Sequence, residues 1–325
     1  MTVMSNGNRI VLFLGVVAMI ICAVVAAYWF GSGNAGESPA AAVPSETVSE
    51  QTLASPVPSV PSTKVTPFVS GRILGDTTLA HALLDDPDES YESVVQNGGT
   101  IISLDNANTF GVWWQPEGFN PATDTVLVSL GGHGGWATRD FSIWYPHISE
   151  RGYGFFSLQY WFGESLESSG YYEPEEMYAM IRQVLAQKGI PPGNVIFQGY
   201  SMGSARSYGI TALDSVGGKY FAVTISNSGV WEDNYPINAD IRTGKYGAQP
   251  FAGIHWMLYC AVNDEEHLDW NKCEKMNTTQ TTIEKYGGEV DLYIKDELGG
   301  HGSFMMNPEN VRRTLDVADT ILSTK

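Results

Sequence analysis

A serine between two glycines stands where an apolar β-type run meets a segment with helical potential. Residues 195–206 read VIFQGYSMGSAR, so Ser201 has Gly199 two positions before it and Gly203 two positions after it. A strand that turns sharply into a helix strains the residue at its apex, and the positions two away must be almost free of side chain. The spacing indicates a nucleophilic serine at a helix N-terminus, whose dipole favours negative charge. Because roughly 0.3 such matches are expected by chance, the chain must also supply the other groups that the serine needs.

A serine hydroxyl becomes a useful nucleophile only when a base takes its proton and an acid orients that base. Of the six histidines, His301 is the predicted base, because it follows the last expected strand in the glycine-rich run LGGHGS. His267 is the alternative base. Asp264 is the predicted acid, as the first carboxylate after the preceding expected strand. Three neighbouring carboxylates remain alternatives to it: Glu265, Glu266 and Asp269.

Backbone N–H groups for an oxyanion are expected from two loops. Met202, directly after the serine, supplies one of them. The other is expected from Gly134 or Gly135, within the run GGHGGW that follows an apolar strand over residues 125–130. A glycine at this position leaves room for a substrate.

Aromatic residues are frequent near these loops, and aromatic faces suit sugars or aromatic acyl groups. Trp136 and Tyr200 are therefore expected to bind substrate. Residues 166–172 are expected to form a short cap over the pocket. The run DEEH over 264–267 does not indicate a metal site, because adjacent residues rarely converge on one ion. Neither a metal nor a cofactor is predicted.

Alternating strands and helices must bring these groups together. From residue 125 onward the alternation predicts an α/β fold with a mostly parallel sheet covered by helices on both faces. The carboxyl ends of such strands are where functional loops gather. Strands are expected at 100–104, 109–114, 125–130, 153–158, 195–197, 220–226, within 251–262, and at 290–294. Helices are expected at 140–151 (interrupted by Pro146), 174–188, 272–286 and 308–322.

With these parts in the order Ser, Asp, His, the chain resembles the α/β-hydrolase family over about residues 100–325. The resemblance rests on the His-Gly-Gly loop, GYSMG at the elbow, Asp264 after a later strand and His301 after the last one. Trp136 departs from the HGGG loop of some esterases. The family order implies acyl transfer to water through an acyl-enzyme on Ser201, with His301 as base and Asp264 holding the imidazole.

The preferred reading is an extracytoplasmic carboxylic ester hydrolase that acts on a small-molecule or polymer-linked ester. A serine peptidase of the same fold, aminopeptidase-like, is the alternative within the family. A surface binding module that has kept the fold and lost the chemistry is the alternative from another class. The net charge of −18, with 36 acidic against 18 basic residues, argues against a nucleic-acid partner, which needs a basic surface.

Three segments are predicted along the chain. Residues 1–30 are expected to be an N-terminal membrane anchor or signal segment, because Ile10 to Phe30 carries no charge and is long enough to span a bilayer as a helix. A transmembrane anchor is preferred, with the remainder outside the cytoplasm; cleavage of the segment would release a secreted protein. Residues 31–66, rich in Pro, Ser and Ala, are expected to be a disordered linker, and residues 67–325 the catalytic domain.

Two of the three cysteines, Cys260 and Cys273, lie close together in the sequence without a C-x-x-C motif. A zinc ribbon or redox motif is therefore not indicated. Outside the cytoplasm the two would form a disulfide. Two buried free thiols are the alternative.

Overall fold

The computed structural model describes residues 90–105, 108–163, 166, 168–264 and 273–324. All of these belong to the unit Ser59–Lys325. The expected anchor over residues 1–30 and the expected linker over 31–66 lie outside the described residues, as does the start of the predicted domain. Across the described stretches, every helix is too short or too polar to cross a bilayer.

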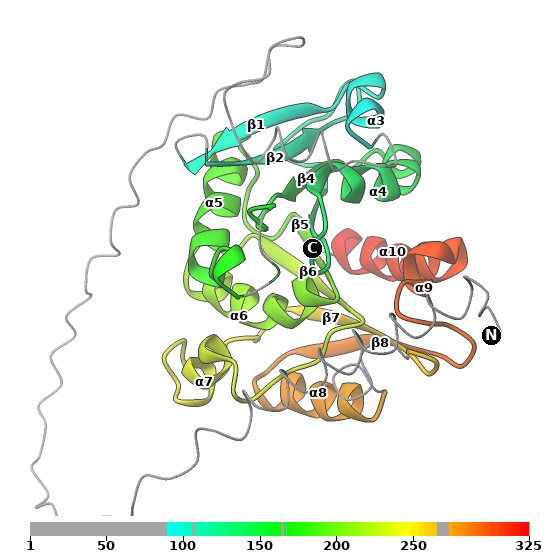
Figure 1. Cartoon of the computed structure of the whole chain (residues 1–325). Coiled ribbons are helices and arrows are strands. Elements are labelled where there is room, and N and C mark those ends of the chain that lie inside the picture. Colours follow the sequence, from blue (N-terminus) through cyan, green and yellow to red (C-terminus); the bar gives the residue numbers. More distant parts are fainter. Residues whose placement is uncertain (1–89, 106–107, 164–165, 167, 265–272, 325) are drawn as a thin grey trace, which may run out of the picture. The chain divides into compact units, whose positions relative to one another are not determined.

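A twisted sheet forms the centre of the described part of the chain, with the strand order β1-β2-β4-β3-β5-β6-β7-β8 (Figure 1). Strands β1 and β2 form an antiparallel hairpin, and β2 also pairs antiparallel with β4. All remaining neighbours are parallel, which confirms the predicted mostly parallel α/β sheet. The strands are β1 Thr100–Leu104, β2 Thr109–Trp114, β3 Val126–Leu130, β4 Gly154–Leu158, β5 Val195–Tyr200, β6 Phe221–Asn227, β7 His255–Ala261 and β8 Glu289–Asp296.

Helices cover both faces of this sheet, with α5 and α6 on one side and α4 and α10 on the other (Figure 1). Strands β3 to β6 are almost completely buried, as expected of a parallel sheet packed on both faces. The helices are α3 Ser90–Gln96, α4 Ala137–Arg151, α5 Pro174–Gln187, α6 Met202–Val216, α7 Pro236–Arg242, α8 Cys273–Lys285, α9 Ser303–Met306 and α10 Pro308–Ser323.

Helix α4 corrects one prediction. It runs without interruption from Ala137 to Arg151, with Pro146 inside it. An internal proline removes one helical hydrogen bond and costs about 3 kcal/mol. Phe141, Trp144 and Ile148 lie on one stripe of α4 and are completely buried. Their burial, at about 1.5–3 kcal/mol for each large apolar side chain, outweighs the lost hydrogen bond.

The turn between β5 and α6 is held by backbone that leaves no space for side chains. A Cβ on Gly199 would collide with the Gly203 carbonyl, and one on Gly203 would collide with the carbonyl groups of Leu130 and Gly131 at the end of β3. Ser201, at the apex, has φ 52° and ψ −114°, a conformation that L-residues rarely adopt. The two glycines therefore allow α6 to begin directly against β3, and the strand, sharp turn and helix follow one another in the predicted order.

A disulfide joins Cys260 in β7 to Cys273 at the start of α8. The sequence left open whether these residues are bonded or are free thiols, and the structure has them bonded. The bond ties together the two ends of the chain segment that contains Asp264.

Asp140, in the first turn of α4, is a buried carboxyl group. Its Oδ2 accepts a hydrogen bond from Ser157 Oγ at 3.0 Å. Burial raises the pKa of Asp140 from 3.8 to about 6, while hydrogen bonds to the carboxylate oppose the shift. The folded protein therefore holds this proton more tightly than the unfolded chain does.

We expect Asp140→Asn to remove a pH-dependent part of the stability. From about pH 4 to about pH 6 the unfolded carboxyl has lost its proton while the folded one still holds it, so its contribution falls as the pH rises. The free energy of unfolding of the variant, relative to the wild type, should rise by roughly 3 kcal/mol across this window. Urea unfolding at a series of pH values measures the difference, and a constant difference would contradict the prediction.

Gly203→Ala should destabilise the fold, because its Cβ meets backbone that cannot rotate away. We expect a loss of about 1–3 kcal/mol in the free energy of unfolding. Gly131→Ala is the matched control, since a Cβ at that position has open space around it. Thermal unfolding of both variants measures the effect, and equal melting temperatures would count against this account of the turn.

Candidate active site

Three side chains from three strand ends form one hydrogen-bonded chain. Ser201 follows β5, Asp264 follows β7, and His301 lies in the loop between β8 and α9. The His301 Nε2 atom lies 2.7 Å from Ser201 Oγ, and Nδ1 lies 2.6 Å from Asp264 Oδ2. The structure thus brings together the predicted nucleophile, base and acid. The alternatives His267, Glu265, Glu266 and Asp269 lie outside the described residues.

The partners determine which nitrogen of His301 carries the proton. A carboxylate accepts only, so Nδ1–H donates to Asp264, which leaves Nε2 to accept the hydrogen bond from Ser201 Oγ. The side chains of His301 and Asp264 are only 6% and 2% exposed. Asp264 Oδ1 is buried and has no hydrogen-bond partner among the described residues. The arrangement can accept the serine proton on Nε2 and stabilise the resulting cation in a site of low dielectric constant.

Hydrogen bonds between loops fix these side chains. Ser228 Oγ, after β6, donates to the His301 carbonyl at 3.0 Å. The Asn263 amide, after β7, donates to the Gly299 carbonyl at 3.1 Å, which links the acid loop to the histidine loop. The ring of Tyr200 lies 5.2 Å from the His301 ring, centroid to centroid. The imidazole is thus held from three neighbouring strand ends.

The loop after β3 differs from the prediction in its hydrogen bonds. The Gly135 amide donates to the Gly132 carbonyl at 3.0 Å and closes a turn. The Gly134 amide donates to the Tyr171 hydroxyl at 3.1 Å. Both amides that were expected to face an oxyanion are therefore engaged within the protein. Met202, as the first residue of α6, has no carbonyl in its own helix to which its amide could donate.

Gly132 is the loop residue that packs against the nucleophile, and the sequence reasoning did not single it out. A Cβ on Gly132 would lie 3.3 Å from Ser201 Cβ and 3.0 Å from the Tyr200 ring. The loop carries His133 as well, whose Nε2 lies 2.9 Å from the Leu166 carbonyl. This contact places Leu166, which is exposed and belongs to the predicted cap, beside the loop.

The two aromatic residues predicted to bind substrate differ in position. Tyr200 is partly exposed and lies between Gly132 and His301, at the site. Trp136 is instead buried against Trp161, with ring centroids 4.9 Å apart, and immediately precedes α4. It belongs to the core, because its place before the helix turns the large ring inward.

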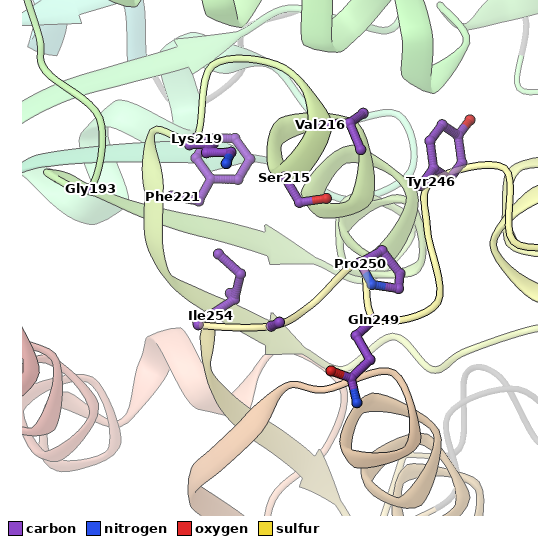
Figure 2. Close-up of a pocket in the computed structure, with 11 residues that line it drawn as sticks. Gly193, Ser215, Val216, Lys219, Phe221, Tyr246, Gln249, Pro250 and Ile254 are labelled. Carbon is purple, nitrogen blue, oxygen red and sulfur yellow. The ribbon is translucent and has the colours of Figure 1, made fainter. Parts of the chain in front are cut away.

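A pocket of about 380 Å³ lies at the other end of the sheet (Figure 2). Its lining residues precede or begin β5, β6 and β7, or end α6, whereas Ser201 follows β5. Lys219, Phe221 and Ile254 are among them. This pocket is therefore separate from the hydrogen-bonded chain of Ser201, His301 and Asp264.

One group with metal-ligand chemistry also lies at that end. His255 begins β7, and its Nδ1 lies 3.0 Å from Asp291 Oδ2 and 4.0 Å from Glu289 Oε2. The three side chains could reach one ion. His255 and Asp291 lie within hydrogen-bonding distance of each other, at the opposite end of the strands from Ser201.

Comparison with known proteins adds evidence on the fold. No protein-family model matches the chain, and neither does any curated protein sequence. Among solved structures, Thermogutta terrifontis esterase 2 phosphoramylated by tabun is 16% identical, with a TM-score of 0.50, and the match covers 70% of this chain and 94% of that one. A putative dienelactone hydrolase from Klebsiella pneumoniae subsp. pneumoniae MGH 78578 is 8% identical, also with a TM-score of 0.50, over 67% of this chain and 93% of the other. At these identities the likeness concerns the fold, and together with the strand order it identifies the chain as having the α/β-hydrolase fold.

Proposed function

We propose that this protein is a serine hydrolase that cleaves carboxylic esters through an acyl-enzyme on Ser201. The observation that carries the proposal is the continuous hydrogen-bonded chain from Ser201 Oγ through His301 to Asp264. Three features support these roles: a partly exposed turn carries Ser201, a ring nitrogen of His301 lies next to its hydroxyl, and a buried carboxyl group lies on the other side of the ring.

The reaction follows from this chain of groups. Ser201 Oγ attacks the ester carbonyl while its proton passes to His301 Nε2, and Asp264 stabilises the imidazolium. Collapse of the tetrahedral intermediate expels the alcohol, which takes the proton from Nε2. Water then attacks the acyl-enzyme, giving its proton to Nε2, and the acid leaves as Ser201 recovers its own proton.

The developing oxyanion would be bound at the start of α6. Two features support this proposal: Met202 is the first residue of α6, and the positive end of a helix dipole favours negative charge. The strained turn at Ser201 keeps this geometry in the free enzyme, so binding need not create it. We assign the Met202 amide as one of the oxyanion donors.

Ester hydrolysis is preferred over the alternatives. One structure with a similar fold is described as an esterase and another as a putative dienelactone hydrolase. A small-molecule or polymer-linked ester is the proposed substrate. An aminopeptidase-like serine peptidase is the alternative, since the same groups cleave amides.

We also propose that the catalytic domain works outside the cytoplasm, held to a membrane by residues 1–30 or secreted after their cleavage. Two observations support the location. Residues 10–30 carry no charge. The disulfide between Cys260 and Cys273 is of a kind that persists in oxidising compartments.

Labelling with a fluorophosphonate tests the nucleophile. The wild type should be labelled, and Ser201→Ala should not, because the probe needs the activated hydroxyl. Ser215→Ala, at the far end of the same helix, is the matched control and should be labelled at the wild-type rate. Labelling that persists in Ser201→Ala, or an unlabelled wild type, would refute the proposal.

Hydrolysis of 4-nitrophenyl acyl esters and aminoacyl 4-nitroanilides separates esterase from peptidase. We expect turnover of the esters, and a fall in kcat of about 10⁴-fold in Asp264→Asn, because the imidazole then loses its orienting acceptor. Turnover confined to the anilides would favour the peptidase. Activity that survives in His301→Ala but vanishes in His267→Ala would overturn the assignment of the base.

A further inference from the structure

Tyr171 has a hydroxyl group with a proton to donate beside the turn that touches the nucleophile. Its oxygen accepts the hydrogen bond from the Gly134 amide at 3.1 Å. Among the described residues, no acceptor binds the proton of this hydroxyl. Gly134 lies two residues after Gly132, which packs against Ser201. The hydroxyl thus lies next to one of the two glycine amides that the sequence led us to expect at the oxyanion.

Two side chains, those of His133 and Arg206, contact the ring of Tyr171. His133 stacks on it with ring centroids 5.5 Å apart and an interplanar angle of 22°. The guanidinium carbon of Arg206 lies 5.5 Å from the ring centroid, and Nη1 of Arg206 donates to the Tyr172 carbonyl. Because the hydroxyl is placed by these contacts and by the Gly134 amide, it is preorganised in the free protein.

Arg206 connects this tyrosine to the helix that carries the nucleophile. It lies in α6, is only 3% exposed, and forms no ion pair with any described carboxylate. Its guanidinium carbon lies equally close, 5.5 Å, to the ring of Tyr160, whose hydroxyl donates to the Gly131 carbonyl at 2.7 Å. Two tyrosines therefore contact the loop after β3, and both rings contact one cation on α6. These contacts thus fix the position of the loop after β3 relative to the helix that follows Ser201.

The protonation state suits a donor. Burial raises the pKa of Tyr171 above its usual value of 10, although the Gly134 amide and the Arg206 charge act in the opposite direction. The hydroxyl therefore keeps its proton at neutral pH. A nearby cation strengthens an O–H group as a hydrogen-bond donor.

We propose that the Tyr171 hydroxyl is the second oxyanion donor, with the Gly134 amide holding its oxygen and Arg206 positioning its ring. This inference rests on the proposed acyl transfer at Ser201. The Tyr171 proton is donated as a hydrogen bond to the oxyanion and stays on Tyr171 throughout, so the proton transfers of the reaction remain those of His301. Gly134 then acts indirectly, because its amide holds the oxygen of the Tyr171 hydroxyl.

Tyr171→Phe tests the proposal, with Tyr178→Phe as the matched control. The Tyr178 hydroxyl also accepts a backbone amide, from Gly218 at 2.7 Å, but it binds Asp214 near the far end of α6. For each variant we would measure kcat and KM with 4-nitrophenyl butyrate. We would also measure the inhibition constants of an aliphatic trifluoromethyl ketone, which forms an oxyanion on the serine, and of butyrate, which does not. Fluorophosphonate titration counts the active sites, so that any loss of folded protein cancels.

In Tyr171→Phe we expect kcat to fall about 10- to 100-fold while KM changes by less than about threefold, because the lost interaction exists only in the transition state. The inhibition constant of the ketone should rise by a similar factor, and that of butyrate should not. Tyr178→Phe should leave all of these constants near the wild-type values.

Other outcomes overturn the inference. Wild-type values of kcat and ketone inhibition in Tyr171→Phe would show that the hydroxyl only braces the loop. A raised KM with an unchanged kcat would assign it to ground-state binding. Both results leave the proposed function intact, whereas a wild type that hydrolyses no ester and takes up no fluorophosphonate would overturn the two proposals together.

Discussion

The contact between the backbone of Gly203 and the carbonyl groups at the end of β3 is the constraint on which the rest of the site depends. It lets α6 start directly against the central strands, which forces Ser201 into its unusual backbone conformation. The same contact fixes the position of the Met202 amide relative to the loop that packs on Ser201. A single added methyl group would separate the helix from the strand and move all of these groups at once.

The buried polar groups around this turn form two linked sets. On one side, Asp264 and His301 face Ser201, and the carboxylate has only the imidazole as its described partner. On the other side, Arg206 with Tyr160 and Tyr171 ties the loop after β3 to α6. Because electrostatic interactions strengthen where water is excluded, each set holds its geometry more firmly than surface groups would. Ser201 lies where the two sets meet.

Local sequence pattern was enough to predict the sheet. Apolar β-type runs and turn residues located all eight described strands. The signal was clearest for β3 to β6, which are buried on both faces and mostly apolar. The order of the motifs along the chain also predicted that Ser201, Asp264 and His301 lie together at the carboxyl ends of the strands. The failures share a cause. Pro146 lies within a helix because distant side chains bury its neighbours. The short helix α7, which the sequence did not indicate, buries Ile237 and Ile241 and packs on α6.

The same reason applies to the oxyanion loop. The Gly134 amide is bound by a hydroxyl 37 positions away in the sequence, and Trp136 is buried by a partner on another loop. Nothing in the local pattern of GGHGGW specifies either contact. The sequence therefore identified which loop approaches the nucleophile, but the long-range packing decides which atoms of that loop are available.

The disulfide described above has a consequence for how the protein must be made. Cys260 and Cys273 bracket the stretch of chain that carries Asp264, so the bonded and reduced proteins differ covalently next to the acid. Protein prepared from a reducing cell interior would be in the reduced form, in which no disulfide connects Cys260 to Cys273. Under the proposed export, oxidation of Cys260 and Cys273 would also complete the covalent connections next to Asp264.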